Sequence, residues 1–187
     1  YRIHPLGIES IPKAGPAVVV CNHVSFMDPI ILGSSVSRPM RFVMHYKIFK
    51  IPFLSFIFRN TQAIPIASKS EDLALMDEAF EKVDAELAAG NIVCIFPEGG
   101  LTDDGEIKRF KPGIERIIER RAVPVIPVAL GRVWGGWFSR QKNGGIRKIP
   151  GRLFMRVSIM FGEPVQPADA SAEKLELLVR ALQRGLR

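Results

Sequence analysis

The chain has few of the residues that metal sites and disulfide frameworks need. Its 187 residues include two cysteines, Cys21 and Cys94, and three histidines. Both cysteines lie in apolar, strand-like runs without the spacing of metal ligands, so we predict no metal site. Two buried thiols suit a reducing compartment better than a disulfide framework does, although the sequence alone leaves a disulfide between them open.

Long apolar runs are absent as well. No stretch approaches the roughly 18 residues needed to span a bilayer, and no signal peptide begins at Tyr1. Internal repeats, low-complexity tracts and Gly/Ser linkers are also missing. We therefore expect residues 1–187 to form one domain. Because the chain starts without Met, we also expect it to be a piece of a longer, membrane-associated protein whose anchor lies elsewhere.

The chain has fewer acidic residues than basic ones, with 19 Asp and Glu against 26 Lys and Arg. The formal net charge is +7, which favours nucleic acid, an anionic membrane surface or a phosphorylated substrate as partner. Aromatic residues are not interleaved with Lys and Arg along a strand as in nucleic-acid platforms, so we expect no nucleic acid. With 47% hydrophobic residues, the chain should form a packed globule.

Apolar runs rich in β-formers alternate with helical patterns, and this alternation predicts an α/β domain with a mostly parallel or mixed central sheet flanked by helices. The runs are continuously apolar, as in strands that are covered on both faces. The predicted strands are 17–22, 40–45, 63–67, 92–97, 123–130 and 153–161. One predicted helix begins at Asp28, with Asp28 as its N-cap. The other predicted helices cover 46–60, 70–90, 113–121 and 171–186.

The first polar cluster that suggests chemistry follows the strand at 17–22. In "VVVCNHVSFMDPIIL", His23 and Asp28 lie between a predicted strand end and a predicted helix start. A carboxylate that accepts from one ring nitrogen fixes the tautomer of a histidine and frees the other nitrogen to act as a base. The alternative is purely structural, with Asp28 only capping the helix.

The second cluster lies in "IVCIFPEGGLTDDGEIKRFKPG", residues 92–113. Glu98 follows a buried run, and Gly99-Gly100 allow backbone N–H groups to approach a ligand closely. Lys111 precedes a predicted helix start, a place that suits a phosphate. The alternative is a solvated, charged loop with glycines for its turns.

These blocks together resemble the glycerolipid acyltransferase family, whose type member is 1-acylglycerol-3-phosphate acyltransferase. Asn22-His23 and Asp28 match its N-H-x4-D motif, "FPEGG" at 96–100 its F-P-E-G block, and "RFKPG" at 109–113 its F-K-x-G element. "VPVIPVAL" at 123–130 matches its last block, although two prolines there could mark an edge strand, a bulge or a turn that lines a cleft.

The resemblance implies the reaction. His23 would be the general base, oriented by Asp28, that deprotonates a glycerol hydroxyl for attack on a thioester. The donor would be acyl-CoA or acyl-carrier protein, and no cofactor is implied. The residues assigned to substrate binding are Asn22, Glu98, Gly99, Gly100, Lys111, Lys69 and Arg59.

The sequence departs from the family at two arginines. Leu101 stands where phosphatidate-forming members carry the Arg of F-P-E-G-T-R-S, and "ASK" at 67–69 stands where they read Asp-Arg. Arg grips a phosphate monoester bidentately, whereas Lys offers only a point charge. The departures resemble bacterial 2-acylglycerophosphoethanolamine acyltransferases, so we expect a lysophospholipid acceptor, with lysophosphatidate as the alternative.

The same resemblance implies work at a membrane. We expect the cytoplasmic face of the bacterial inner membrane, and a fused transporter or acyl-ligase domain as partner. Trp134 and Trp137, followed by Arg140 and Lys142, suit a membrane interface, whereas 47–58 reads more as a buried helix. Other possibilities are a non-catalytic basic module that binds lipid or nucleic acid, and a degenerate scaffold domain, which the intact His23–Asp28 pair disfavours.

Overall fold

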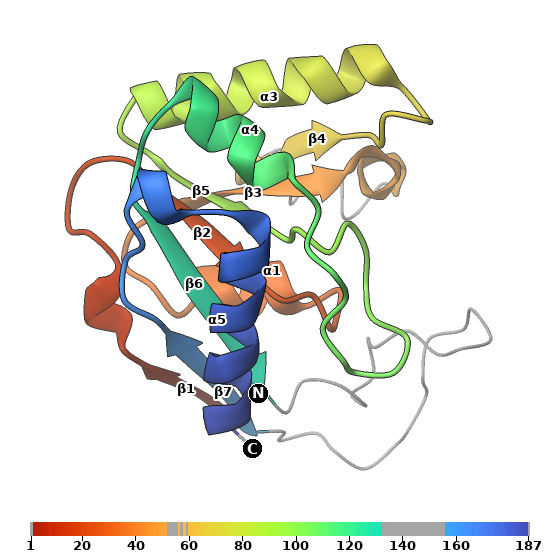
Figure 1. Cartoon of the computed structure of the whole chain (residues 1–187). Coiled ribbons are helices and arrows are strands. Elements are labelled where there is room, and N and C mark those ends of the chain that lie inside the picture. The colour runs from red at the N-terminus through yellow and green to blue at the C-terminus, as the bar shows by residue number, and fades with distance from the viewer. Residues whose placement is uncertain (1, 52–55, 57, 59, 132–155, 187) are drawn as a thin grey trace.

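The computed structural model describes residues 2–51, 56, 58, 60–131 and 156–186. These residues form one seven-stranded sheet with the order β1-β7-β6-β2-β5-β3-β4 (Figure 1). Neighbouring strands are parallel except β6 and β7, which are antiparallel. The strands are β1 (Arg2–Leu6), β2 (Ala17–Cys21), β3 (Met40–His45), β4 (Ile64–Ile66), β5 (Ile92–Ile95), β6 (Val125–Gly131) and β7 (Arg156–Phe161). The predicted α/β class with a mixed sheet is confirmed.

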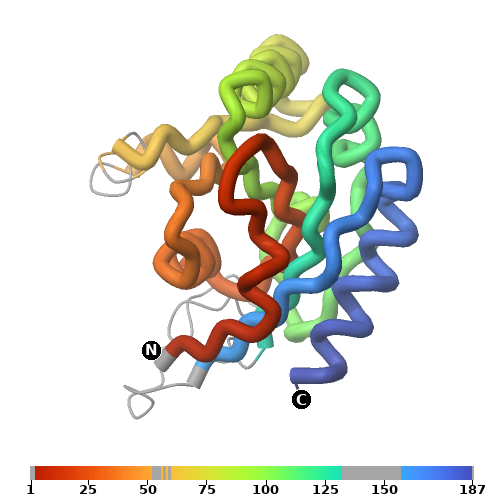
Figure 2. The backbone as a smooth tube through the Cα atoms, turned by 90° about the vertical axis from the view of Figure 1, so that its left-hand side faces the viewer, coloured from red at the N-terminus to blue at the C-terminus, as the bar shows by residue number. Residues whose placement is uncertain are grey.

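Helices cover both faces of this sheet. Figure 2 shows α5 on one side and the chain through α1 on the other. The first face carries α3 (Leu73–Ala88), α4 (Gly113–Arg120) and α5 (Ala172–Gly185). The second carries α1 (Asp28–Gly33) and the 3-10 helix η2 (Tyr46–Lys50), and short 3-10 turns η1 (Ile8–Ser10) and η3 (Pro167–Asp169) complete the elements.

The central strands are buried on both faces, which explains their uninterrupted apolar sequence. In β2, Val18 and Val20 pack into the core under α3, α4 and α5. Val19 and Cys21 of the same strand pack into the core under α1 and η2. All four are fully buried, and both cysteines of the chain are free thiols.

The long helix α3 follows its sequence signals. Asp72 is the N-cap, and its side chain accepts a hydrogen bond from Leu75 N at 2.9 Å. Gly90 follows the helix with a φ of +81°, a backbone conformation that favours glycine. The predicted helices at 113–121 and 171–186 are also confirmed as α4 and α5.

Two strand predictions need correction. The sequence places no strand before residue 17, but Arg2–Leu6 forms β1 and pairs in parallel with β7. Its Pro5 obscures the pattern, and an edge strand tolerates proline because only one side is paired. An edge position for 123–130 is wrong, because β6 lies between β2 and β7. Pro127 sits where pairing with β7 begins, and its carbonyl accepts from Gly162 N at 2.8 Å.

Two helix predictions also change. Met27 is the N-cap of α1, and Asp28 is the first helical residue, so Asp28 does not cap the helix with its side chain. The segment 46–60 begins as the 3-10 helix η2 rather than an α-helix. Beyond it, Phe58 is buried but Phe56 is 70% exposed, so a fully buried helix is not what the described residues form.

Some predictions fall on residues outside the described part of the chain. They are Arg59 and the residues predicted to lie at a membrane interface, Trp134, Trp137, Arg140 and Lys142. Among the described residues, no helix combines the length and the apolar character that crossing a membrane requires.

Candidate active site

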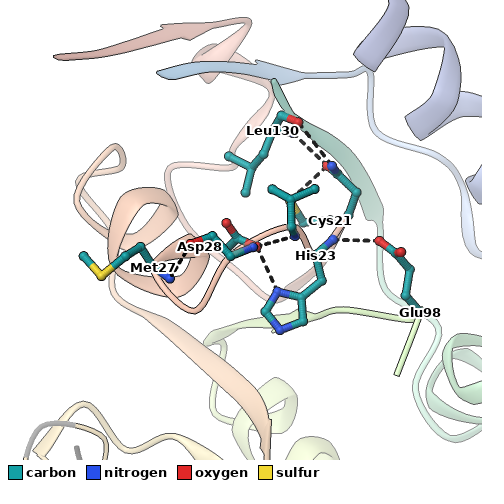
Figure 3. Close-up of polar contacts among 9 residues, drawn as sticks. Cys21, His23, Met27, Asp28, Glu98 and Leu130 are labelled. Atoms are coloured by element: carbon teal, nitrogen blue, oxygen red, sulfur yellow. Dashed lines mark hydrogen bonds and ion pairs between the residues drawn. The ribbon is translucent and has the colours of Figure 1, made fainter. Parts of the chain in front are cut away.

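His23 and Asp28 meet at the carboxyl end of β2. The His23 Nδ1 atom lies 2.8 Å from Asp28 Oδ2 (Figure 3). The same oxygen accepts from Val24 N at 2.7 Å and from Ser25 N at 2.9 Å. These contacts arise because α1 starts at Asp28 and folds its side chain back onto the loop that follows β2. The pair is therefore held by the backbone as well as by itself.

The two side chains of this pair differ in their exposure to solvent. Asp28 is fully buried, whereas the His23 side chain keeps 16% of its surface exposed. An Asp28 carboxylate on Nδ1 fixes the tautomer with the proton on Nδ1, which leaves Nε2 as the acceptor. Nε2 has no hydrogen-bond partner among the described residues, and the ring stacks on Phe96 with 4.3 Å between centroids. The imidazole is thus oriented and free to take a proton.

Glu98 holds the backbone of the histidine. Its Oε1 accepts from His23 N at 2.7 Å (Figure 3), and its Oε2 accepts from Lys108 N at 2.8 Å. His23 O in turn accepts from Thr102 N at 3.0 Å. Burial raises the pKa of Glu98, and the hydrogen bonds from the Lys108 and His23 backbone act in the opposite direction. Glu98 therefore ties the loop after β5 to His23.

Asn22, the residue before His23, also holds backbone groups through its side chain. Its Nδ2 donates to Leu130 O at 3.1 Å, and its Oδ1 accepts from Leu130 N at 2.7 Å. Asn22 is fully buried and continues the β2–β6 ladder with side-chain atoms. Neither Asn22 nor Glu98 is among the described residues that line the cavity beside His23. In the described structure, these two residues, which are predicted to bind substrate, hold the backbone around His23.

A cavity of about 890 Å³ opens beside His23. Its exposed lining residues include the polar side chains of Ser70, Lys69 and Lys111. Most of its buried lining residues are apolar side chains of the sheet, α3 and α4, among them Met44, Ala79, Phe80, Val83, Ile95, Ile114 and Ile117. No Asp or Glu is among the described residues that line it. The cavity can hold a long apolar group with an anionic end near His23.

Lys111 brings a positive charge to the exposed part of the cavity lining, called its mouth below, and it lies against Gly99. Gly99 has a φ of +71°, and a Cβ added to it would collide with the Lys111 side chain, so a larger residue would displace the lysine from this position. Lys111 is exposed and has no ion-pair partner among the described residues. The predicted residues Gly99, Gly100, Lys69 and Lys111 therefore all line the cavity.

Several contacts were not anticipated from the sequence. The stacking of Phe96 on His23 and the hydrogen bond from Thr102 N to His23 O join residues far apart in the chain. His45 and Ser68 also line the cavity, and only their positions at the ends of predicted strands could have indicated this. Over the described ranges, no three His, Cys, Asp or Glu side chains are arranged to hold a metal ion.

Replacing Asn22 with alanine should lower the free energy of unfolding by about 2–4 kcal/mol, because Leu130 N and O would both be buried without a partner. Urea denaturation followed by circular dichroism measures the loss. Asn91→Ala is the matched control, since the Asn91 side chain is only half-buried and donates to Glu86 at 2.6 Å. Equal losses in both variants would contradict a structural role for Asn22.

Known proteins resemble this chain in sequence. A family model described as Acyltransferase matches residues 2–131. The chloroplastic 1-acyl-sn-glycerol-3-phosphate acyltransferase LPAT1 of Arabidopsis thaliana is 30% identical over 131 residues, which are 70% of this chain and 36% of the relative. The 1-acyl-sn-glycerol-3-phosphate acyltransferase of Borreliella burgdorferi is 29% identical over 136 residues, 69% of this chain and 51% of the relative.

A solved structure agrees in fold. The 1-acyl-sn-glycerophosphate (LPA) acyltransferase PlsC from Thermotoga maritima matches with a TM-score of 0.72 at 25% identity, over 100% of this chain and 72% of that chain. The chain spans between about a third and about half of the length of the two curated relatives. The matched family region contains the His23–Asp28 pair, Glu98 and Lys111. The chain therefore belongs to the acyltransferase family that its motifs indicated.

Proposed function

We propose that this domain moves an acyl group from a thioester donor to the free glycerol hydroxyl of a lysophospholipid. One observation carries the proposal: the free Nε2 of His23, oriented by Asp28, lies at the mouth of a largely apolar cavity of about 890 Å³. A base beside a long apolar cavity fits a reaction between a hydroxyl and a fatty acyl thioester.

The proposed reaction is a direct transfer. His23 Nε2 takes the proton of the acceptor hydroxyl as the hydroxyl oxygen attacks the thioester carbonyl carbon. A carbon–oxygen bond forms, the carbon–sulfur bond breaks, and the proton on His23 passes to the leaving thiolate. Asp28 stabilises the protonated imidazole through Nδ1. This scheme uses no cofactor beyond the thioester, which we propose is acyl-CoA or acyl-carrier protein.

The cavity supplies the place for the acyl chain. Its buried walls come from α3 and α4, including Phe80, Val83, Ile114 and Ile117. An alkyl chain loses contact with water there, which favours binding by roughly 0.8 kcal/mol for each buried methylene group. This apolar lining supports a long-chain donor over a short one.

The cationic mouth supports an acceptor with a phosphate. Lys69 and Lys111 line it as point charges, and Leu101 is buried where phosphatidate-forming members carry Arg. Two lysines are enough to balance the single negative charge of a phosphodiester. They cannot replace the bidentate hydrogen bonds that arginine makes to a phosphomonoester. We therefore propose a lysophosphodiester acceptor, with lysophosphatidate second because the relatives are named for it.

An acceptor panel tests this order. Lysophosphatidylethanolamine should be acylated severalfold faster than lysophosphatidate with the same donor, because the described mouth lacks the arginines that grip a monoester. Mass spectrometry of the lipid products, with acyl-CoA and acyl-carrier protein as alternative donors, measures the preference. A strong preference for lysophosphatidate would contradict it.

We also propose that the domain works at a membrane surface, on the cytoplasmic face of the bacterial inner membrane. Its lipid substrates, its net charge of +7 and its exposed Phe26 and Ile30 near the catalytic loop support a membrane contact. A fused transporter or acyl-ligase domain remains part of this proposal as a partner. Co-sedimentation with anionic vesicles tests the contact, and failure to sediment at low salt would oppose it.

A further inference from the structure

A second group of charged residues lies at the rim of the same cavity. The Glu71 carboxylate binds Lys47 Nζ through Oε1 at 2.7 Å and His45 Nε2 through Oε2 at 2.9 Å. Ser68 Oγ also donates to Oε2, at 2.9 Å. The Lys47 and His45 contacts lower the pKa of the Glu71 carboxyl far below its ordinary value, so the group carries a full negative charge at neutral pH. The Glu71 carboxylate thus neutralises Lys47 and accepts a hydrogen bond from His45 at the end of β3.

Glu71 is close to where an acceptor headgroup would lie. Two of its partners, His45 and Ser68, line the cavity, as do Lys69 and Ser70 next to it in the sequence. The Glu71 side chain is 30% exposed, so its charge acts on solutes at the rim through a partly aqueous medium. The carboxylate is therefore one side chain away from the cavity rather than remote from it.

The start of α3 adds to this effect. A helix N-terminus attracts anions through its backbone N–H groups and its dipole. Here Asp72 accepts from Leu75 N at 2.9 Å, and Glu71 precedes it. The Asp72 carboxylate already satisfies part of this positive end. Among the described lining residues, Lys69 and Lys111 remain as cations without a carboxylate partner.

We propose that Glu71 determines acceptor specificity by disfavouring a phosphomonoester dianion relative to a phosphodiester. The proposal rests on the proposed function and names the acceptor class for that same site. An ionised Glu71 repels each additional negative charge of the headgroup, and it keeps Lys47 from contributing an unbalanced positive charge. This repulsion weakens the binding of a phosphomonoester, which carries nearly two negative charges, more than the binding of a phosphodiester with one negative charge or of a zwitterion.

Three variants test the effect of the local charge near Glu71. Glu71→Gln adds one positive charge, Lys47→Gln removes one, and the double variant restores the balance. The ratio of kcat/KM for lysophosphatidate to that for lysophosphatidylethanolamine should rise about three- to tenfold in Glu71→Gln. It should fall in Lys47→Gln and return near the wild-type ratio in the double variant. Lysophosphatidylglycerol, with one net charge, should show an intermediate change.

A control and a binding measurement separate the possible outcomes. Glu78→Gln removes an exposed carboxylate of α3 that pairs with Lys82, and it should leave the ratio unchanged. Binding of glycerol 3-phosphate, followed by NMR titration, should tighten in Glu71→Gln while binding of glycerophosphoethanolamine stays the same. This readout needs no catalysis, so a wild-type chain without acyl transfer would overturn the proposed function alone. An unchanged ratio with unchanged glycerol 3-phosphate binding, or parallel losses for both acceptors, would overturn the role of Glu71.

Discussion

Replacing His23 with alanine should lower the rate of acyl transfer by about 10²–10⁴-fold, because the reaction would lose its general base. The His23 side chain is held by Asp28 and stacked on Phe96, and no other imidazole is bonded to a buried carboxylate in the described residues. The initial rate of thiol release with acyl-CoA and lysophospholipid measures the loss.

His4→Ala is the matched control for this variant. His4 lies on the exposed edge strand β1, so its removal takes one imidazole from the chain without touching the site. We expect this control to keep the wild-type rate, and both variants to keep the wild-type far-UV circular dichroism spectrum. A His23→Ala chain that transfers acyl groups at the wild-type rate would contradict the assignment of the base and favour a non-catalytic binding module.

Replacing Glu98 with alanine should lower kcat by about 10–100-fold, because a small displacement of a catalytic group is enough for such a loss. Glu98 joins His23 N to Lys108 N, so its removal frees the backbone on both sides of the site. The KM values for both substrates should stay near those of the wild type. Steady-state kinetics with each substrate varied in turn measures the two effects separately.

Conservative variants sharpen this expectation. Glu98→Gln keeps one acceptor oxygen but turns an N–H donor toward another N–H, so its kcat should lie between those of the wild type and Glu98→Ala. Glu163→Ala removes an exposed glutamate and should change neither constant. A raised KM for the acceptor with an unchanged kcat would instead support the direct substrate contact that the family resemblance implied for Glu98.

The sequence predicted the parts of the fold that local patterns determine. Strands β2, β5 and β6 are apolar on both faces, and α3 carries a capping Asp72 and a following Gly90. By contrast, β1 is an edge strand with a proline, so its apolar pattern is weak. Its pairing with β7 depends on contacts with the other end of the chain. Such contacts are not encoded in short windows of sequence.

The site shows the same division. The His23–Asp28 contact spans five residues and follows from a helix that starts at Asp28. The roles of Glu98 and Asn22 depend on partners 75 and 108 residues away, so a motif match could identify these residues but not their contacts. The bond between Glu71 and Lys47 spans 24 residues and lies in no family motif that the sequence displays. Physical contacts, rather than motifs, therefore separate the residues that position His23 from those that line the cavity.

The most direct test of the proposed function is the stoichiometry of the products. The purified chain would be incubated with a long-chain acyl thioester and lysophosphatidylethanolamine, and free thiol and diacylated lipid would be measured in the same samples. Direct transfer from the thioester to the glycerol hydroxyl predicts equal amounts of the two, and neither above background with His23→Ala. Thiol release without diacylated lipid would show hydrolysis instead of transfer, and it would contradict the acyltransferase assigned to this site.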